Sequence, residues 1–175
     1  MPVSSEDFRR ALRCFPSGVS IVTIRAGQTI HGLTVSAFAS VSPDPPVIAV
    51  IIDHKHKAYE IMERKNAAFA VNILHQDQSA LSNRFAWGKD TDRFAEGSWT
   101  HAVTGAPILE DALAWLDCTI FDRHESGTHV IYLGEVQATG VAPENTQPLV
   151  YWNRGYRQLE GCTEGTNGEK MESED

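Results

Sequence analysis

The sequence predicts a mainly β fold: an antiparallel barrel, closed or nearly closed, with a few peripheral helices. Two observations support this fold. Short segments rich in β-branched residues outnumber the helical segments. These strands follow one another in hairpin order, separated by turns that contain Gly. Both features favour an antiparallel barrel over a doubly wound parallel sheet.

The N-terminal part of the chain is predicted to form a short helix followed by a hairpin. Ser4 or Ser5 can cap the helix, whose apolar residues recur at helical spacing. Pro16 and Gly18 then end it. Two strands rich in β-branched residues follow and are joined by a turn. The strands occupy 19–24 and 29–41, and the turn occupies 26–28.

The rest of the chain adds further strands and two helices. The run 47–52 is apolar on both faces, which is typical of a central strand. A helix marked by Ala58, Ile61 and Met62 follows it directly. We expect further strands at 67–74, 112–122, 128–138 and 149–152, and a helix at 77–85 followed by an irregular stretch.

Length and charge indicate one domain with an acidic extension. A chain of 175 residues is near the common size of one domain. Its net charge of −8 argues against a nonspecific grip on nucleic acid, and half of that charge lies from Gly161 onward. This end is poor in large apolar residues and cannot offset the entropy of ordering. We therefore expect one domain over 1–160 and a disordered tail over 161–175.

The apolar runs and the cysteines bear on location. The longest apolar run, 47–52, has six residues, whereas a membrane-spanning helix needs about 20. The polar start of the chain lacks the apolar core of a signal peptide, so we expect a soluble protein in the cytoplasm. Cys14, Cys118 and Cys162 are odd in number and form no CxxC pair, which indicates reduced thiols.

The segment 32–43 is the most unusual in the chain. Neither GxGxxG nor GxxxxGK[ST] occurs, so any nucleotide must be held in another way. If 29–41 is one strand, alternation places a row of hydroxyls on one face. That face is either a solvated barrel surface or a polar groove for a flat heterocycle and its phosphate. The residues on it are Thr34, Ser36, Phe38, Ser40 and Ser42.

The segment 53–57 lies between a predicted strand and a predicted helix. Unpaired amides at a helix start, joined by Lys55 and Lys57, favour an anion such as phosphate. The spacing of His54 and His56 could instead begin a metal site, although no further paired ligand set accompanies it. A solvated basic loop is the remaining reading.

Two further segments could carry chemistry. His129 begins a predicted strand, where a lone histidine is either structural, exposed or available for proton handling. The segment 151–157 interleaves aromatic and basic residues, as grooves for single-stranded nucleic acid do. Because the chain is acidic, a barrel-closing strand packed at an interface is the preferred role for 151–157.

Four motifs in order make the chain resemble the flavin reductase family. They lie at 15–23, 32–46, 105–118 and 127–136, and the resemblance covers about 8–156. It implies an FMN-binding split β-barrel that forms a homodimer. It also implies FMN, sometimes FAD, as the flavin and NADH or NADPH as the source of electrons.

The resemblance also implies the positions of the ligands. The flavin ring lies along 34–37, the phosphate lies near His56 and Lys57, and His129 lies near the nicotinamide. In this chain Thr128 replaces the aspartate that precedes that histidine in the family. The implied flavin-binding residues are Thr34, Val35, Ser36, Ala37, Ser40, Ser42, His56, Lys57, Arg84 and Phe85.

The function implied by the resemblance is an FMN-dependent NAD(P)H:flavin oxidoreductase that supplies reduced flavin to a partner such as a two-component monooxygenase. Relatives that reduce another acceptor, such as a cobalt corrinoid, look similar. A non-catalytic flavin-binding module and a structural barrel are the alternatives from other classes. The aromatic stretch 87–99 is the expected dimer surface.

Overall fold

The computed structural model describes residues 3–89, 93–143 and 146–159, and its main element is a seven-stranded antiparallel sheet. In spatial order, this sheet contains β3 (Thr29–Val35), β2 (Ser20–Ala26), β6 (Ala68–Ile73), β9 (Ala114–Ser126), β10 (His129–Val141), β5 (Pro46–Asp53) and β4 (Phe38–Pro43). The described helices are α1 (Ser5–Leu12), α2 (Lys57–Met62) and α3 (Ser79–Trp87).

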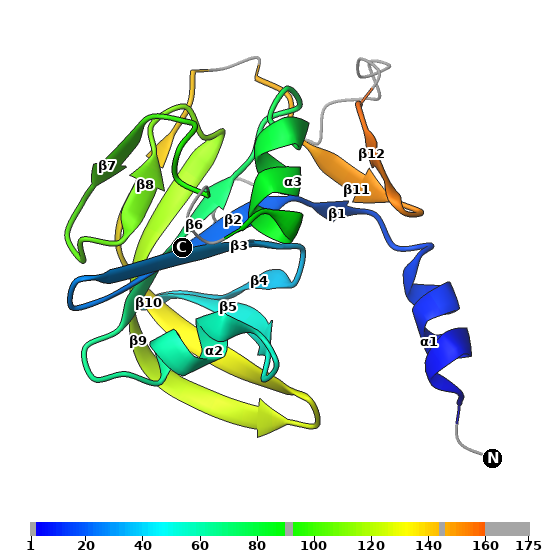
Figure 1. The fold of residues 1–175 in the computed structure, drawn as a ribbon, viewed down its shortest axis with the longest axis horizontal. Helices are drawn as coiled ribbons and strands as arrows, with labels where there is room; N and C mark the ends of the chain where they lie inside the picture. The colour runs from blue at the N-terminus through cyan, green and yellow to red at the C-terminus, as the bar shows by residue number, and fades with distance from the viewer. Residues whose placement is uncertain (1–2, 90–92, 144–145, 160–175) are drawn as a thin grey trace, which may run out of the picture.

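Two smaller sheets lie outside the main one. The first contains β1 (Ser17–Gly18), β11 (Val150–Trp152) and β12 (Gly155–Arg157). The second pairs β7 (Trp99–His101) with β8 (Pro107–Leu109). Figure 1 shows the β11–β12 pair beside α3 and apart from the β9–β10 hairpin.

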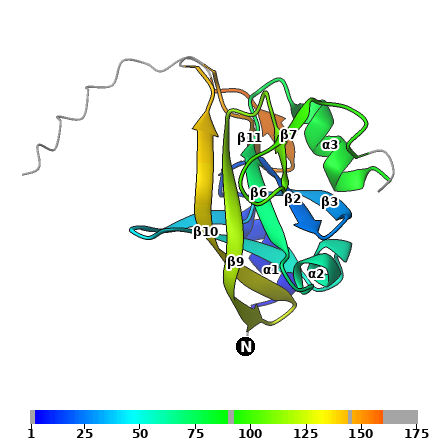
Figure 2. The same ribbon diagram turned by 90° about the vertical axis from the view of Figure 1, so that its left-hand side faces the viewer.

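The main sheet curls into a split barrel. The evidence is that its two edge strands, β3 and β4, follow one another directly in the sequence. β3 and β4 lie at opposite ends of the spatial order, yet only Ser36 and Ala37 separate them in the chain. The two edges must therefore meet at this junction, although β3 and β4 do not pair with each other. Figures 1 and 2 show the long β9–β10 hairpin standing across the other strands. The predicted antiparallel barrel is confirmed.

A hydrophobic core fills the barrel. Phe69 from β6, Tyr132 from β10 and Ile24 from β2 are fully buried in it. α2 adds Ala58, Ile61 and Met62 to the same core, as the helical spacing predicts. A second core covers the outer face of β2 with residues from α3 and β8. Burial on both faces explains why adjacent residues of β2, such as Ile21 and Val22, are both apolar.

α1 is the most exposed element of the described chain. The Ser4 side chain caps it by accepting a hydrogen bond from the Asp7 amide (3.1 Å), as predicted. No residue of α1 is buried, and Phe8 and Leu12 are more than half exposed. Figure 1 shows the helix standing apart from the barrel. The longest helix among the described residues has nine residues, too short to cross a bilayer.

The structure corrects the prediction that 29–41 is one strand with one hydroxyl face. The chain leaves the sheet after Val35 and re-enters it at Phe38, on the opposite edge. A further irregularity lies between Ser40 and Ser42, where the pairing with β5 shifts. Alternation therefore does not run through the whole segment, because the two halves pair with different strands.

Two other predictions need correction. The strand predicted at 149–152 does not close the barrel, because β11 pairs with β1 and β12 in a separate sheet. The stretch predicted as irregular contains β7 and β8. The other predicted strands and helices are confirmed with small shifts of their ends. The predicted tail 161–175, including Cys162, lies outside the described residues.

Candidate functional site

The junction between β3 and β4 is the floor of an open groove. Ser36 and Ala37 are both exposed there. Ser36 lines three adjoining pockets, which extend toward α1, α3 and the β11–β12 pair. The pocket toward α3 has a volume of about 170 Å³. The split in the barrel therefore exposes backbone and small side chains in a concave surface, which suits a flat ligand.

The hydroxyl groups near this junction have different partners. Thr34 donates its hydroxyl hydrogen bond to the Ser82 carbonyl of α3 (2.6 Å), so it ties β3 to that helix. The Ser42 hydroxyl donates to the Asp44 carbonyl (3.0 Å) in the turn before β5. Among the described residues, the side chains of Ser36 and Ser40 have no hydrogen-bond partner. Ser36 is thus the hydroxyl most available to a ligand in the groove.

The segment 53–57 lies near this junction in the barrel. The Ile51 amide donates to the Ala37 carbonyl (3.1 Å), which connects the junction directly to β5. β5 ends at Asp53, and α2 begins at Lys57, with His56 as the preceding cap residue in extended conformation. Lys57 is exposed. The predicted phosphate residues therefore lie close to the predicted flavin-ring residues.

His129 lies at the same end of the barrel. It begins β10 and pairs with Asp53 across the sheet, two residues along from the pairing of Ile51 with Ile131. The Thr128 hydroxyl and His129 Nδ1 are 2.8 Å apart and share a hydrogen bond. Thr34–Ala37, 53–57 and His129, which are distant in the sequence, are thus brought to one region.

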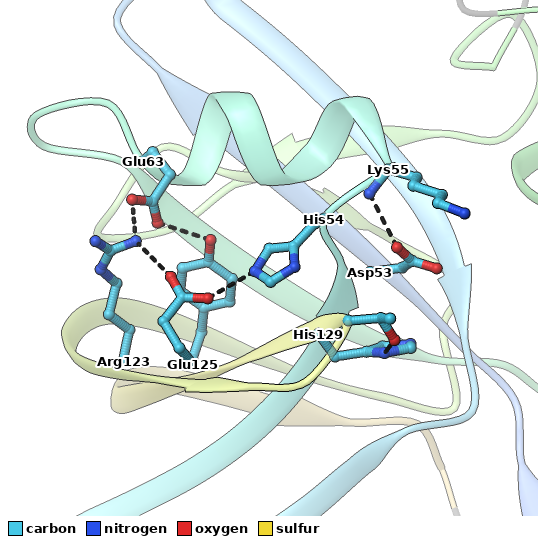
Figure 3. A network of polar contacts seen from close by, with 9 residues as sticks. Asp53, His54, Lys55, Glu63, Arg123, Glu125 and His129 are labelled. Carbon is cyan, nitrogen blue, oxygen red and sulfur yellow. Dashed lines mark hydrogen bonds and ion pairs between the residues drawn. The ribbon is translucent and has the colours of Figure 1, made fainter.

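Asp53 supplies a carboxylate next to His129 that the sequence lacks at position 128. The Asp53 side chain accepts a hydrogen bond from the Lys55 amide (2.9 Å). This bond lowers the pKa of Asp53, and the charges of His129, Lys55 and His54 lower it further. The carboxylate is therefore ionised at neutral pH and faces the histidine from the neighbouring strand, as Figure 3 shows.

A network of polar contacts holds the β9–β10 hairpin against α2 (Figure 3). Glu63, at the end of α2, accepts hydrogen bonds from Arg123 and from the Tyr132 hydroxyl (2.8 Å). Glu125 pairs with His54 Nε2 (2.6 Å) and lies 3.7 Å from Arg123. Burial and the bond to Glu63 raise the pKa of Tyr132 well above its ordinary value. The network fixes the hairpin that carries His129.

The side chains of two residues that are predicted to contact the flavin, Arg84 and Phe85, do not line the groove. Arg84 forms an ion pair with Glu96. Phe85 is fully buried and packs against Phe94 and Trp99. A Cβ at Gly32 would lie 2.5 Å from the Phe85 ring, so this ring of α3 packs directly against the backbone of β3. Ser40 and Ser42 also lie away from the junction, toward the far end of β4.

Sequence reasoning missed a buried cationic residue near the site. Arg93 is 7% exposed, and it donates to the Gly32 carbonyl (2.7 Å) and lies 3.0 Å from His31 Nε2. His31 is also buried, and its ring centre is 6.3 Å from that of His56. Arg93 lies in the stretch predicted as irregular, where no pattern distinguishes a buried arginine from an exposed one.

The two histidines of the segment 53–57 face different neighbours. His54 turns toward Glu125, whereas His56 lies near His31. The part of the chain that the structure describes holds no group of three or more metal-ligating side chains. Cys14 and Cys118 are free thiols.

A family model described as flavin reductase like domain matches residues 12–160. The chain belongs to this family. The actinorhodin polyketide dimerase of Streptomyces coelicolor is 37% identical over 86% of this chain and 84% of its own. An FMN reductase (NADH) of Agrobacterium fabrum is 36% identical over 89% and 88%. The reductase component of an FADH(2)-dependent resorcinol hydroxylase from Rhizobium is 36% identical over 86% and 85%.

Solved structures of this flavin reductase family share the fold. A Haemophilus somnus protein described as a flavin reductase has a TM-score of 0.85 and 37% identity, covering 90% of this chain and 100% of that one. An NADH:FAD oxidoreductase of Streptomyces globisporus, solved with NAD and FAD fragments, has a TM-score of 0.84 and 28% identity over 93% and 99%. The split β-barrel described above is therefore the family fold.

Proposed function

We propose that this chain is an NAD(P)H-dependent flavin reductase that supplies reduced flavin to a partner such as a two-component monooxygenase. The observation that carries the proposal is the meeting of the 34–37 junction, the 53–57 segment and His129 at one end of the barrel. The relatives named as an FMN reductase and as a hydroxylase reductase component support the same activity.

The groove fits a flavin in shape and in charge. Ser36 and Ala37 present small side chains, so a flat ring can approach the backbone closely. Lys57 supplies a positive charge near that surface for a phosphate of the ligand. FMN is the proposed cofactor, and FAD shares the same ring and phosphate. When bound, the flavin accepts a hydride at N5 from the nicotinamide of NADH or NADPH.

The protein's own residues orient the ligands and handle charge. The residues proposed to hold the ring are Thr34, Val35, Ser36 and Ala37, and His56 and Lys57 are proposed for the phosphate. His129 is proposed to lie on the nicotinamide side as a hydrogen-bond donor or positioning group. The Thr128 hydroxyl shares a hydrogen bond with His129 Nδ1 and so orients the histidine ring.

A non-catalytic flavin-binding module is the second candidate, because Thr128 stands where the family has a carboxylate. Asp53 opposite His129 restores a carboxylate to the site and favours the enzyme. NADH oxidation with added FMN or FAD separates the two. We expect turnover that requires both flavin and NADH. Flavin binding without NADH oxidation would leave only the binding module, and no flavin binding would leave a structural barrel.

We also propose that the enzyme is a homodimer. The sequence predicts 87–99 as the contact surface, and among the described aromatic residues of this stretch Phe94 and Trp99 pack against Phe85, whereas Trp87 is exposed. The exposed apolar side of α1, with Phe8 and Leu12, is better placed to be covered by a second copy. Light scattering at micromolar concentration should give twice the chain mass. A monomer that binds FMN tightly would contradict the dimer.

A cytoplasmic location is part of the same proposal. The free thiols Cys14 and Cys118 suit a reducing compartment.

A further inference from the structure

A small aromatic pocket lies between α3 and the β11–β12 pair and opens onto the junction between β3 and β4. Its aromatic residues are Trp87 at the end of α3, Tyr151 of β11 and Tyr156 of β12. Thr34 of β3 and Ser36 of the junction complete this side of the lining. Figure 1 shows α3 beside the β11–β12 pair. The pocket therefore adjoins the surface proposed for the flavin ring and has further walls of its own.

The size and charge of this aromatic pocket fit one neutral ring. Its volume is about 170 Å³. A cavity of about 150 Å³ in another protein holds benzene, so the three-ring flavin is too large for this pocket. Each described residue that lines it is uncharged at neutral pH. Neither Lys57 nor His129 is among them, so the pocket is separate from the sites proposed for the phosphate and the nicotinamide.

Trp87 places an indole ring at the edge of the pocket. Its side chain is 87% exposed, although a tryptophan ring is among the largest apolar surfaces that a residue can bury. It follows Asn83 by four residues on α3, and residues at this spacing lie on the same face of a helix. The exposed indole therefore gives an aromatic ligand a flat surface on which to stack.

Asn83 supplies hydrogen-bond donors beside this ring. The Tyr156 hydroxyl donates toward Ser82 Oγ (2.8 Å) and Asn83 Oδ1 (3.0 Å). Among the described residues, the amide N–H groups of Asn83 have no hydrogen-bond partner. Amide N–H groups donate to carbonyl oxygens. The pocket thus combines a stacking surface with free donors, which suits a neutral ring that carries carbonyl oxygens.

We propose that this pocket binds a single-ring quinone, which accepts electrons from the reduced flavin. The quinone ring stacks on Trp87, and one quinone oxygen accepts a hydrogen bond from Asn83. Ser36 lines both this pocket and the adjoining groove, so the two ligands lie next to each other. This inference rests on the proposed function, because that function supplies the electrons.

The proposed reaction transfers two electrons and two protons to the quinone. NADH or NADPH, one proton and the quinone give the oxidised nicotinamide and the hydroquinone. The nicotinamide loses its C4–H bond together with two electrons, which reach the quinone by way of the flavin. The two quinone oxygens gain these electrons and form two O–H bonds, one proton coming from the hydride and the other from solvent.

Equilibrium dialysis of FMN-saturated protein against duroquinone, without NADH, tests the pocket directly. Duroquinone has no unsubstituted ring position, so it resists addition of the exposed Cys14 thiol. The wild type should bind duroquinone saturably. Trp87→Ala and Asn83→Ala should each weaken this binding about tenfold and leave FMN affinity unchanged. No saturable binding by the wild type, or an equal loss of FMN affinity in either variant, would overturn the proposal.

Trp87→Phe and Lys89→Ala are the controls. Phenylalanine keeps a stacking ring, so Trp87→Phe should bind duroquinone within about threefold of the wild type. Lys89 is exposed just beyond α3 and does not line the pocket, so Lys89→Ala should bind it unchanged. Because Trp87 and Asn83 are exposed, their alanine variants should keep the wild-type thermal midpoint. Equal weakening by Lys89→Ala, or weaker binding only where the thermal midpoint falls, would overturn the assignment.

Anaerobic stopped-flow mixing of NADH-reduced protein with duroquinone tests the electron transfer. The rate of flavin reoxidation should saturate with duroquinone concentration. Trp87→Ala should raise the half-saturating concentration about tenfold and leave the rate of reduction by NADH unchanged. A rate that rises linearly and equally in both proteins would show that dissociated flavin reduces the quinone, and would overturn the proposal. A decrease confined to the rate of reduction by NADH would assign the pocket to the nicotinamide and overturn it as well.

The two experiments separate this proposal from the proposed function. An absence of NADH oxidation in the wild type would refute the proposed function, while the dialysis result would still decide whether the pocket binds a quinone.

Discussion

Two polar networks with different construction lie on the sheet, one buried and one between α2 and the β9–β10 hairpin. In the buried network, Asn72 donates to the Ile21 carbonyl (3.1 Å) and accepts from the Leu109 amide (2.7 Å). Asp117 accepts from the amide of Thr104 (2.8 Å) and from its hydroxyl. Asn72 and Asp117 are fully buried. Together they attach the chain around β8 to the outer face of the main sheet.

The network between α2 and the β9–β10 hairpin is partly exposed to solvent. Its carboxylates, Glu63 and Glu125, keep side-chain exposures of 26% and 56%, and its partners Arg123 and His54 keep 46% and 32%. Exposed charges are screened, whereas a buried polar group that loses its partner retains the full cost of desolvation. We therefore expect the buried network to contribute more to the stability of the fold, and the exposed network to act mainly on the hairpin that carries His129.

Burial also changes the acidity of the thiol of Cys118, which lies next to Asp117 in the sequence. Cys118 follows Asp117 in β9 and is fully buried in the barrel core. Burial raises its pKa to about 12, and the negative charge of Asp117 contributes to the increase. The thiol is therefore protonated at neutral pH and behaves as a small apolar group. The interior accepts a carboxylate only where hydrogen bonds stabilise it, as they do at Asp117.

The largest effect is expected from Asp117→Ala in the buried network. Both hydrogen bonds to Thr104 are lost, and its amide and hydroxyl lose their acceptor. The free energy of unfolding should fall by about 3 kcal/mol, as expected for a broken buried network. Urea denaturation measures the change. FMN affinity of the folded protein should remain at the wild-type value. A loss of FMN affinity at unchanged stability would show that Asp117 serves the ligand site and not the fold.

Lys57→Ala should have the next largest effect and should act on the ligand. A charge-assisted bond to a phosphate contributes about 1.5 to 3 kcal/mol, so FMN affinity should fall roughly ten- to a hundredfold. Fluorescence titration of FMN measures this change. Stability should change little, because the side chain is exposed at the start of α2.

Riboflavin and Lys65 provide the controls for Lys57. Riboflavin lacks the phosphate and should bind wild type and Lys57→Ala almost equally. Lys65→Ala removes an exposed lysine beyond the other end of α2 and should leave FMN affinity unchanged. Unchanged FMN affinity in Lys57→Ala would refute the phosphate assignment, and Lys55 would become the better candidate.

His129→Ala should have a smaller effect, confined to hydride transfer. A positioning residue on the nicotinamide side should lower the rate of flavin reduction about tenfold and change FMN affinity less than about twofold. Stopped-flow reduction by NADH measures the rate. Asp53→Asn should give a smaller decrease in the same rate, because it removes the charge opposite His129 and keeps an acceptor for the Lys55 amide. Equal loss of FMN binding in His129→Ala would place the histidine in the flavin site.

The sequence predicted the elements of the barrel better than their connections. Apolar runs such as 47–52 specify strands through local patterning, and the structure confirms them as β5 and its neighbours. The break at Ser36 has no local signal, because it depends on which strands β3 and β4 pair with. The position of β11 outside the barrel likewise has no local signal, because it depends on the pairing of β11 with β1.

The candidate site shows the same limit. The segments 34–37, 53–57 and 127–129 could be predicted from the sequence, the first two from their residue types and all three from the resemblance to flavin reductases. The carboxylate at Asp53 facing His129 could not, since it follows from the pairing of β5 with β10. Burial of Arg93 depends on the folding of a segment without periodic pattern.

Glu125→Gln should have the smallest effect and tests the exposed network directly. The substitution removes the charge that faces His54 and Arg123 but keeps the size of the side chain. Exposed ion pairs contribute little to stability, so the thermal midpoint should shift by less than about 4 °C.

The rate of hydride transfer should be more sensitive to Glu125→Gln than the thermal midpoint is, because Glu125 pairs across the sheet with Val130, the residue after His129. Raising the salt concentration in wild-type protein should reproduce part of the decrease, because it screens the same charges. Glu110→Gln is the matched control, since Glu110 is an exposed carboxylate outside both networks. If Glu125→Gln lowered the thermal midpoint as much as Asp117→Ala, the two networks would be equivalent supports of the fold and the proposed division between them would be wrong.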